Sequence, residues 1–216
     1  MKALAMDWSC RKKTTARRET IIEPFREVMG ERLDRSFQYW TMCGKCFAED
    51  GSPLPGCELD QVVEARLVDP EQFVGVDVDP AVVEGNARAW PGVRWLCDDF
   101  YTAMLSATSD RSFNPGIVNC DTPFRVERGA RAMGNIMILL NSHARNDVML
   151  VANVVGAVKY YGYESDPMSV LSENEAFRWA WQHGKWEFYK DAVYEYQGSG
   201  TNDLTTMCSL VFFKKA

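Results

Sequence analysis

The sequence lacks a long apolar run. No stretch approaches the ~18 uninterrupted apolar residues that a membrane-spanning helix needs. The beginning, MKALAMDWSCRKK, contains neither an apolar segment of signal-peptide length nor a small-residue cleavage site behind one. We therefore expect a soluble, cytoplasmic protein that makes no membrane contact.

The sequence also has few metal ligands. There are two histidines, His143 and His183, and neither lies at zinc-knuckle spacing from the single Cys-x-x-Cys pair, Cys43 and Cys46. A structural zinc site needs four ligands, usually as two pairs, and Cys57 alone does not complete one. We expect no metal. Most of the seven cysteines lie beside apolar residues, which is typical of reduced, buried thiols rather than of a disulfide framework.

What is present is enough for one folded unit. The 216 residues are 46% hydrophobic and 12% aromatic, which suits one globular domain with a small extension. Residues 1–18 carry six basic side chains against one acidic, a net charge of +5, so the remainder carries −11 because the whole chain is −6. A basic arm of this kind either binds nucleic acid or is simply a solvated chain end.

From residue 37 the sequence alternates between strand and helix patterns. The expected strands cover 37–43, 72–79, 93–99, 116–121 and 147–156, and the expected helices cover 57–68, 80–90, 100–107, 127–144 and 169–184. Five such units predict a parallel sheet with helices on both faces. Two further strands, 185–197 and 204–213, flank the turn-rich GSGTND and predict an antiparallel hairpin.

An amphipathic helix is expected before the alternation, over 20–33, with Thr20 and Glu23 as a capping box. We therefore divide the chain into a basic arm with this helix, 1–36, and a main domain, 37–216.

The order of elements, ending on an antiparallel strand among parallel ones, resembles the class I S-adenosylmethionine-dependent methyltransferases over residues 37–216. The resemblance implies an α/β fold, with a doubly wound, mostly parallel seven-stranded sheet and a C-terminal antiparallel hairpin. It also implies S-adenosylmethionine as the cofactor, bound at the carboxyl ends of the strands.

Acidic residues follow the second and third expected strands. GVDVDP is similar to the family's second motif, which implies that Asp77 accepts hydrogen bonds from the ribose hydroxyls. Asp79 is the alternative, unless it only caps the helix that begins at Pro80. CDDF ends the third strand, and the resemblance implies that Asp99, with Phe100 beside it, binds adenine; Asp98 is the alternative. Either aspartate is also a common helix cap.

The first motif departs from the family. The family follows its first strand with an acidic residue and closely spaced glycines, which let the backbone approach the cofactor. Here Cys43 and Gly44 stand at that place, but no Gly-x-Gly follows in CGKCFAEDGSPLPGCELD. Glu58, like Glu49 and Asp50, offers a carboxylate for the methionine amino group. This loop is either a divergent version that closes over the cofactor or the remnant of a lost site.

NCDTPF ends the fourth strand and resembles the Asp/Asn-Pro-Pro-Tyr/Phe motif of amino-methylating nucleic-acid enzymes. The resemblance implies that Asp121 accepts a hydrogen bond from an exocyclic amine and that Pro123 and Phe124 form the turn and the stacking ring for an extruded base. Thr122 replaces the first proline and loosens the turn. Asn119 lies two residues earlier, on the same side of the strand as Asp121, and is a second candidate amine acceptor. Alternatively, Asp121 is a strand-end acid and Phe124 a core ring.

Three functions remain open. The first is methylation of an exocyclic amine of a nucleic-acid base, most simply adenine in DNA or RNA. A chain of this length holds only a catalytic core, so such an enzyme would need a protein partner, a homodimer or a single-stranded target; it resembles small methyltransferases of phages and mobile elements. The second is a small-molecule or protein methyltransferase, which suits the acidic body better. The third is a non-catalytic scaffold subunit that keeps the fold.

Overall fold

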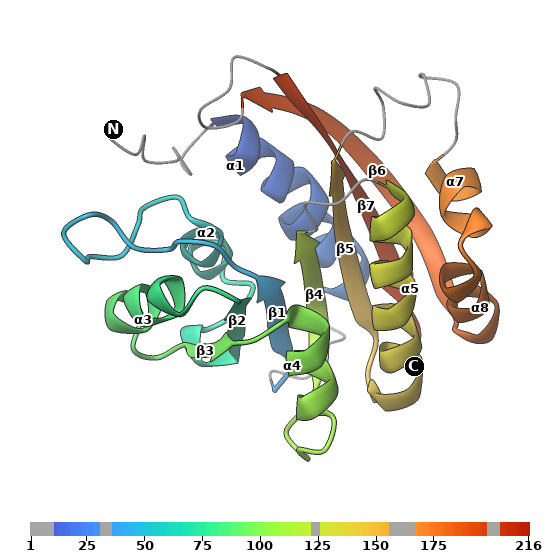
Figure 1. The fold of residues 1–216 in the computed structure, drawn as a ribbon, viewed down its shortest axis with the longest axis horizontal. Helices are drawn as coiled ribbons and strands as arrows, with labels where there is room; N and C mark the ends of the chain where they lie inside the picture. The colour runs from blue at the N-terminus through green and yellow to red at the C-terminus, as the bar shows by residue number, and fades with distance from the viewer. Residues whose placement is uncertain (1–10, 31–35, 122–125, 156–166, 198–203) are drawn as a thin grey trace.

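The computed structural model describes residues 11–30, 36–121, 126–155, 167–197 and 204–216 (Figure 1). Its strands are β1 (Gln38–Met42), β2 (Phe73–Asp77), β3 (Arg94–Cys97), β4 (Pro115–Asp121), β5 (Val148–Val155), β6 (Trp186–Gln197) and β7 (Leu204–Lys214). They form one seven-stranded sheet in the order β3-β2-β1-β4-β5-β7-β6.

The sheet is parallel from β3 to β5, and β7 lies antiparallel between β5 and β6. Each parallel connection needs a crossover, which the helices provide. This arrangement confirms the predicted fold class, a mostly parallel sheet with a C-terminal antiparallel hairpin. The carboxyl ends of the five parallel strands point the same way, and in Figure 1 the arrowheads of β1 and β4 lie at one edge.

Each predicted helical segment contains a helix within the described residues, but the short helix at 70–72 was not predicted, and the helix predicted over 57–68 ends at Glu64. They are α1 (Arg11–Arg17), η1 (Arg18–Ile22), η2 (Phe25–Met29), α2 (Glu58–Glu64), η3 (Pro70–Gln72), α3 (Pro80–Ala89), α4 (Phe100–Ala107), α5 (Val126–His143), α7 (Pro167–Glu173) and α8 (Glu175–His183). The predicted helix 100–107 is confirmed without a shift in its bounds.

Two helix predictions are wrong in detail. The segment 169–184 is two helices, because the Asn174 side chain accepts hydrogen bonds from the backbone amides of Ala176 and Phe177 and starts a new helix there. The N-terminal helix begins at Arg11, before the proposed capping box, and Thr20 lies inside it. The Thr20 hydroxyl donates to the Ala16 carbonyl instead of capping.

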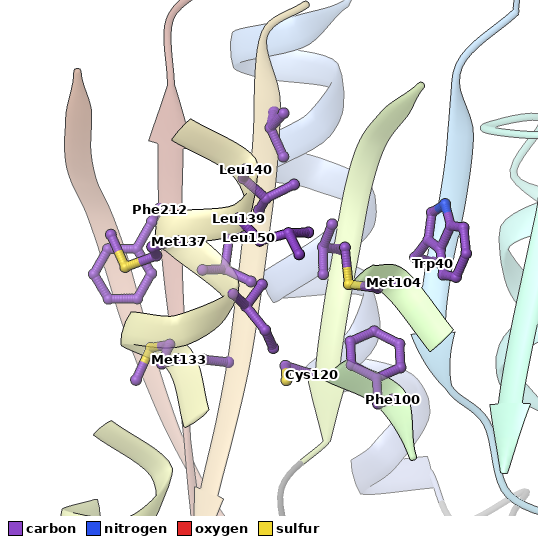
Figure 2. Packing of buried hydrophobic residues seen from close by; sticks show 14 of the residues in the cluster. Trp40, Phe100, Met104, Cys120, Met133, Met137, Leu139, Leu140, Leu150 and Phe212 are labelled. Carbon is purple, nitrogen blue, oxygen red and sulfur yellow. The ribbon is translucent and has the colours of Figure 1, made fainter. Parts of the chain in front are cut away.

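Each face of the sheet has its own core. Figure 2 shows part of the first, where Phe100 of α4 and Met133 of α5 lie in the same cluster as Phe212 of β7. Residues of α8, such as Phe177, complete this cluster. On the opposite face η1, η2 and α2 bury Ile21, Met29 and others against the sheet. Burial on both faces explains why the central strands are continuously apolar.

None of the helices within the described residues has the length and apolar character needed to cross a membrane.

The close packing of α5 on α8 depends on Gly134. A Cβ at this position would lie 2.4 Å from the backbone nitrogen of Phe177 and 2.6 Å from the carbonyl carbon of Ala176. We expect Gly134→Ala to lower the free energy of unfolding by about 1–3 kcal/mol, because backbone atoms cannot move aside cheaply. Chemical denaturation measures it.

Gly92→Ala is the matched control, since the nearest atom to its Cβ would be 3.7 Å away. If Gly134→Ala were as stable as this control, α5 and α8 would not pack as closely as the structure shows.

Candidate cofactor and substrate site at the carboxyl edge of the sheet

Asp77 and Asp79 lie at the end of β2 and do different things. Asp77 is half-buried, and its Oδ1 accepts a 2.9 Å hydrogen bond from the Asp79 backbone amide. The Asp79 carboxylate accepts from the Ala81 amide and caps α3, immediately before Pro80. Val78 between them is 71% exposed. Asp79 therefore caps α3, and Asp77 is the stronger candidate to accept hydrogen bonds from the hydroxyl groups of a ligand.

The end of β3 lies beside the end of β2. The Asp98 backbone amide donates to the Asp77 carbonyl at 3.2 Å, and the Asp98 side chain accepts from the Asp99 amide at 2.8 Å. Asp99 caps α4 by accepting from the Thr102 amide. Phe100 is 5% exposed and packs into the first core, so its ring does not face a ligand. Only its backbone is available for the predicted adenine contact.

The loop between β1 and α2 is held against α3. The Asn86 side chain accepts from the Cys46 amide at 2.7 Å and donates to the Gly44 carbonyl at 3.1 Å. The Trp90 indole donates to the Cys46 carbonyl at 2.9 Å. A Cβ on Gly85 would lie 2.1 Å from the ring of Phe47, so this glycine makes room for the loop. The long loop therefore has a defined conformation.

Sequence reasoning missed the α3 residues that hold this loop. Asn86 and Trp90 are part of GNARAW, which resembles an ordinary exposed helix end. The available signal was the asparagine at a position that helical periodicity places on the inner face. Asn86 is 0% exposed, and a buried amide of this kind needs partners.

Glu58 is the first residue of α2 and is buried. Its Oε1 accepts from the Tyr39 hydroxyl at 2.8 Å and from the Asn119 amide at 2.9 Å. Its Oε2 lies 3.9 Å from the Arg17 Nε, and a second Arg17 nitrogen donates to the Gly56 carbonyl. Burial, and then the Glu58 carboxylate, raise the pKa of Tyr39 well above its usual value, so its hydroxyl stays protonated as a donor.

Asn119 has a different environment from the predicted one. It is 2% exposed, and its side-chain oxygen accepts from the Asn153 amide at 3.1 Å. The Ser209 hydroxyl in turn donates to the Asn153 oxygen. Because the Asn119 side chain points into the second core and is bonded at both ends, it orients Glu58 and does not present itself to a substrate. Cys43 is likewise buried, at 3% exposed.

Asp121 is exposed at the end of β4, paired in register with Asn153 of β5. The residues predicted to complete its motif, Pro123 and Phe124, lie outside the described residues, as does the tyrosine-rich segment 159–166. Burial raises the pKa of the Cys120 thiol to about 12, and the Asp121 and Asp99 carboxylates add to the effect. Both carboxylates therefore act on the same thiol at this edge.

No family model and no curated protein matches the sequence. Solved structures do match the fold. A putative RNA methyltransferase from Pyrococcus horikoshii is 12% identical, with a TM-score of 0.50 over 97% of this chain and 89% of its own. The type IIG restriction endonuclease BpuSI is 10% identical, with a TM-score of 0.51 over 86% of this chain and 23% of its own.

The chain has the class I methyltransferase fold. In this methyltransferase fold, Asp77, Asp98, Asp99 and Asp121 all lie at the carboxyl edge, where ligands of doubly wound sheets bind. No group of three His, Cys, Asp or Glu side chains within the described part of the chain is arranged to hold a metal ion. The candidate site thus consists of carboxylates, backbone groups and one half-buried arginine.

We expect Asn86→Ala to loosen the loop between β1 and α2. The substitution leaves the Cys46 amide and the Gly44 carbonyl without their partner. Each buried unsatisfied group costs about 1–3 kcal/mol, so we expect a loss of at least about 2 kcal/mol in the free energy of unfolding. Chemical denaturation, with hydrogen exchange at the Cys46 amide, tests this.

Arg88→Ala is the control, because Arg88 lies exposed on the same helix. We expect it to change stability by no more than about 0.5 kcal/mol. Equal stability of the two variants would contradict the assigned role of Asn86.

Proposed function

We propose that this chain is an S-adenosylmethionine-dependent methyltransferase that methylates an exocyclic amine of a nucleic-acid base. The observation that carries the proposal is the set of carboxylates at the carboxyl edge of a class I methyltransferase sheet. In this proposal Asp77 binds the ribose, Asp99 or Asp98 binds adenine, and Asp121 binds the methyl acceptor; the support is that all four lie at the carboxyl ends of the strands.

The residues also suit the amino-acid end of the cofactor. That end carries one ammonium and one carboxylate, and Glu58 with Arg17 presents the two opposite charges, with side chains 9% and 14% exposed. One Glu58 oxygen accepts from Tyr39 and Asn119, and the other, Oε2, lies 3.9 Å from the Arg17 Nε and is the oxygen that would take an ammonium in this proposal. The Arg17 guanidinium is the counterpart for the carboxylate. In this proposal Glu58 replaces the acidic residue that the family places after its first strand.

When bound, S-adenosylmethionine supplies a methyl group activated by its positive sulfur. The protein then needs only to bind and orient the acceptor, because in-line positioning provides most of the acceleration in such a transfer. Asp121 is exposed at the end of β4 and holds an amine by accepting its hydrogen bond. We assign Asn119 to positioning Glu58, since its amide is used inside the protein.

The proposed nucleic-acid contact through the N-terminal arm has fewer free charges than the sequence implies. Arg17 pairs with Glu58 inside the protein, and Arg18 pairs with Glu23 at 2.9 Å on the surface. Lys2 lies outside the described residues. A protein partner or a homodimer remains part of the proposal, as does a cytoplasmic location.

A small-molecule or protein methyltransferase is the second candidate. The net charge of −6 favours it, because an acidic surface repels the phosphates of nucleic acid. The acceptor assay below separates the two candidates, and a non-catalytic scaffold would bind no cofactor at all.

We expect Asp77→Ala to raise the Kd for S-adenosylmethionine at least about tenfold, because a hydrogen bond to a charged group contributes about 1.5–3 kcal/mol. Isothermal titration with S-adenosylmethionine and S-adenosylhomocysteine measures the Kd. Asp79→Ala is the matched control: it removes the α3 cap and lowers stability by about 1 kcal/mol while leaving the Kd nearly unchanged.

An unchanged Kd in Asp77→Ala would remove the ribose assignment. A larger effect in Asp79→Ala than in Asp77→Ala would exchange the two roles. Wild-type protein that binds neither ligand at millimolar concentration would favour the scaffold.

We expect Asp121→Ala to bind S-adenosylmethionine as tightly as wild type but to transfer methyl groups at least about 100-fold more slowly, because the amine loses its hydrogen-bond acceptor. The assay follows radiolabelled methyl transfer onto single-stranded and double-stranded DNA, RNA, a protein pool and small amines.

Asp191→Ala is the control, because Asp191 is an exposed carboxylate on β6. Full activity of Asp121→Ala on nucleic acid would show that Asp121 is only a strand-end acid. Transfer to proteins or small amines alone would establish the second candidate.

A further inference from the structure

Three thiols lie in the loop that takes the place of the glycine-rich motif. Cys43 follows β1, Cys57 precedes Glu58 at the start of α2, and Cys46 lies between them in the chain. The exposed fraction is 3% for Cys43, 2% for Cys46 and 1% for Cys57. The Sγ atoms of Cys43 and Cys46 are 3.1 Å apart, and the Cys46 and Cys57 thiols are close enough for each to shift the pKa of the other. The proposed methyl transfer uses none of these sulfur atoms.

The arrangement suits a disulfide better than a metal. No set of three side chains among the described cysteines, histidines and acids is placed to hold a metal ion. A disulfide needs an S–S distance of about 2.05 Å, so the Cys43 and Cys46 sulfurs must approach by only about 1 Å. Cys43 and Cys46 are the loop cysteines for which the structure gives a direct contact between sulfur atoms, at 3.1 Å.

We propose that Cys43 and Cys46 form a reversible disulfide, and that this modification site controls the cofactor-binding loop between β1 and α2. The oxidant is a hydroperoxide or a low-molecular-weight disulfide.

The chemistry is balanced with hydrogen peroxide as the oxidant. One thiolate attacks a peroxide oxygen, the O–O bond breaks, and a sulfenic acid and hydroxide form. The second thiol attacks the sulfenic sulfur, the S–O bond breaks, and hydroxide leaves as water after it is protonated. In sum, two thiols and one peroxide give one disulfide and two waters. A small disulfide gives the same product by two exchange steps and releases two small thiols.

The raised pKa values of the three loop thiols make their oxidation slow as long as the loop keeps the conformation described above. The hydrogen bond with Cys43 and burial raise the pKa of Cys46, and the hydrogen bond with Cys46 and burial raise that of Cys57. The hydrogen bond with Cys46 lowers the pKa of Cys43, but burial and the Glu58 carboxylate raise it overall. The thiols are therefore protonated at neutral pH, and thiolate becomes available at higher pH or when the loop opens.

The effect on the cofactor rests on the proposed function. Drawing Cys46 toward Cys43 shifts the Cys46 amide and the Gly44 carbonyl, the two groups that Asn86 holds against α3. Both lie in the loop that would face the cofactor. We expect the oxidised protein to bind S-adenosylmethionine at least about fivefold more weakly, a value at the lower end of typical coupling between sites. By linkage, bound cofactor then protects the two thiols.

Lys45 provides a sharp test of the disulfide, because it lies between the two cysteines. The full chain is oxidised with hydrogen peroxide, remaining thiols are blocked, and the denatured protein is digested with trypsin without reductant. Cleavage after Lys45 separates SFQYWTMCGK from CFAEDGSPLPGCELDQVVEAR. A Cys43–Cys46 disulfide keeps these two peptides joined with the blocking group on Cys57, and reductant releases them. A Cys43–Cys57 disulfide also joins them, but with the blocking group on Cys46, and that result overturns the assigned pair.

Each other outcome counts against the proposal. A second peptide lighter by two hydrogens shows a Cys46–Cys57 disulfide and overturns the assigned pair. Separate, blocked peptides overturn the disulfide altogether, provided that the exposed Cys97 has been oxidised in the same sample.

Variants separate the modification from its effect. Cys43→Ala is expected to abolish the joined peptides, and Cys97→Ser, an exposed cysteine outside the loop, is expected to retain them. The Kd for S-adenosylmethionine is measured for reduced and oxidised wild type and Cys97→Ser. If the peptides are joined but the Kd for S-adenosylmethionine is unchanged, the disulfide does not control the cofactor-binding loop. If the reduced protein binds no cofactor, the proposed function is contradicted, but the peptide result still shows whether the disulfide forms. If Cys43→Ala does not fold, Cys43→Ser replaces it.

Discussion

A buried carboxylate at the start of α2 constrains much of this molecule. Glu58 is 8% exposed, and a charge at that depth is costly unless other groups compensate for it. The compensating groups come from α1, β1 and β4, through Arg17, Tyr39 and Asn119. The Asn153 amide of β5 then donates to Asn119, and the Ser209 hydroxyl of β7 donates to Asn153. One charge thus connects the N-terminal helix, the centre of the sheet and the C-terminal hairpin.

The loop between β1 and α2 solves the problem of the missing glycines in another way. A glycine-rich loop brings the backbone close to a ligand because it has no side chains in the way. Here the loop instead packs closely against α3. Gly85 of α3 leaves space for the ring of Phe47, and the Asn86 side chain hydrogen bonds to the loop backbone. The loop keeps its shape through contacts with α3, and the three thiols fill its interior.

The prediction of the parallel part of the fold succeeded because β2 and β4 are short, buried runs that end in an aspartate. β4 was predicted over 116–121 and covers 115–121, and β2 was predicted over 72–79 and covers 73–77. Burial on both faces gives each of these strands a continuous apolar run, which makes it easy to recognise. The failures were local. Asn174 was predicted inside a helix, although its side chain caps one, and Thr20 was predicted as a cap, although the helix begins earlier. Both depend on the hydrogen-bond partner chosen by a short polar side chain.

The sequence by itself determined the fold class and the terminal hairpin, because both follow from the periodicity of apolar residues. It also determined that acidic residues stand at the ends of β2, β3 and β4, because these residues come directly after each apolar run. Only the tertiary structure decided what each acid does. Asp79 caps a helix, Asp77 does not, and Glu58 is buried rather than exposed. Asn119 and Asp121 share one side of a strand, yet one is enclosed and the other exposed. For Glu58 and Asn119 the reason is that the hydrogen-bond partners lie 19 to 61 positions away in the chain, and no local pattern records them.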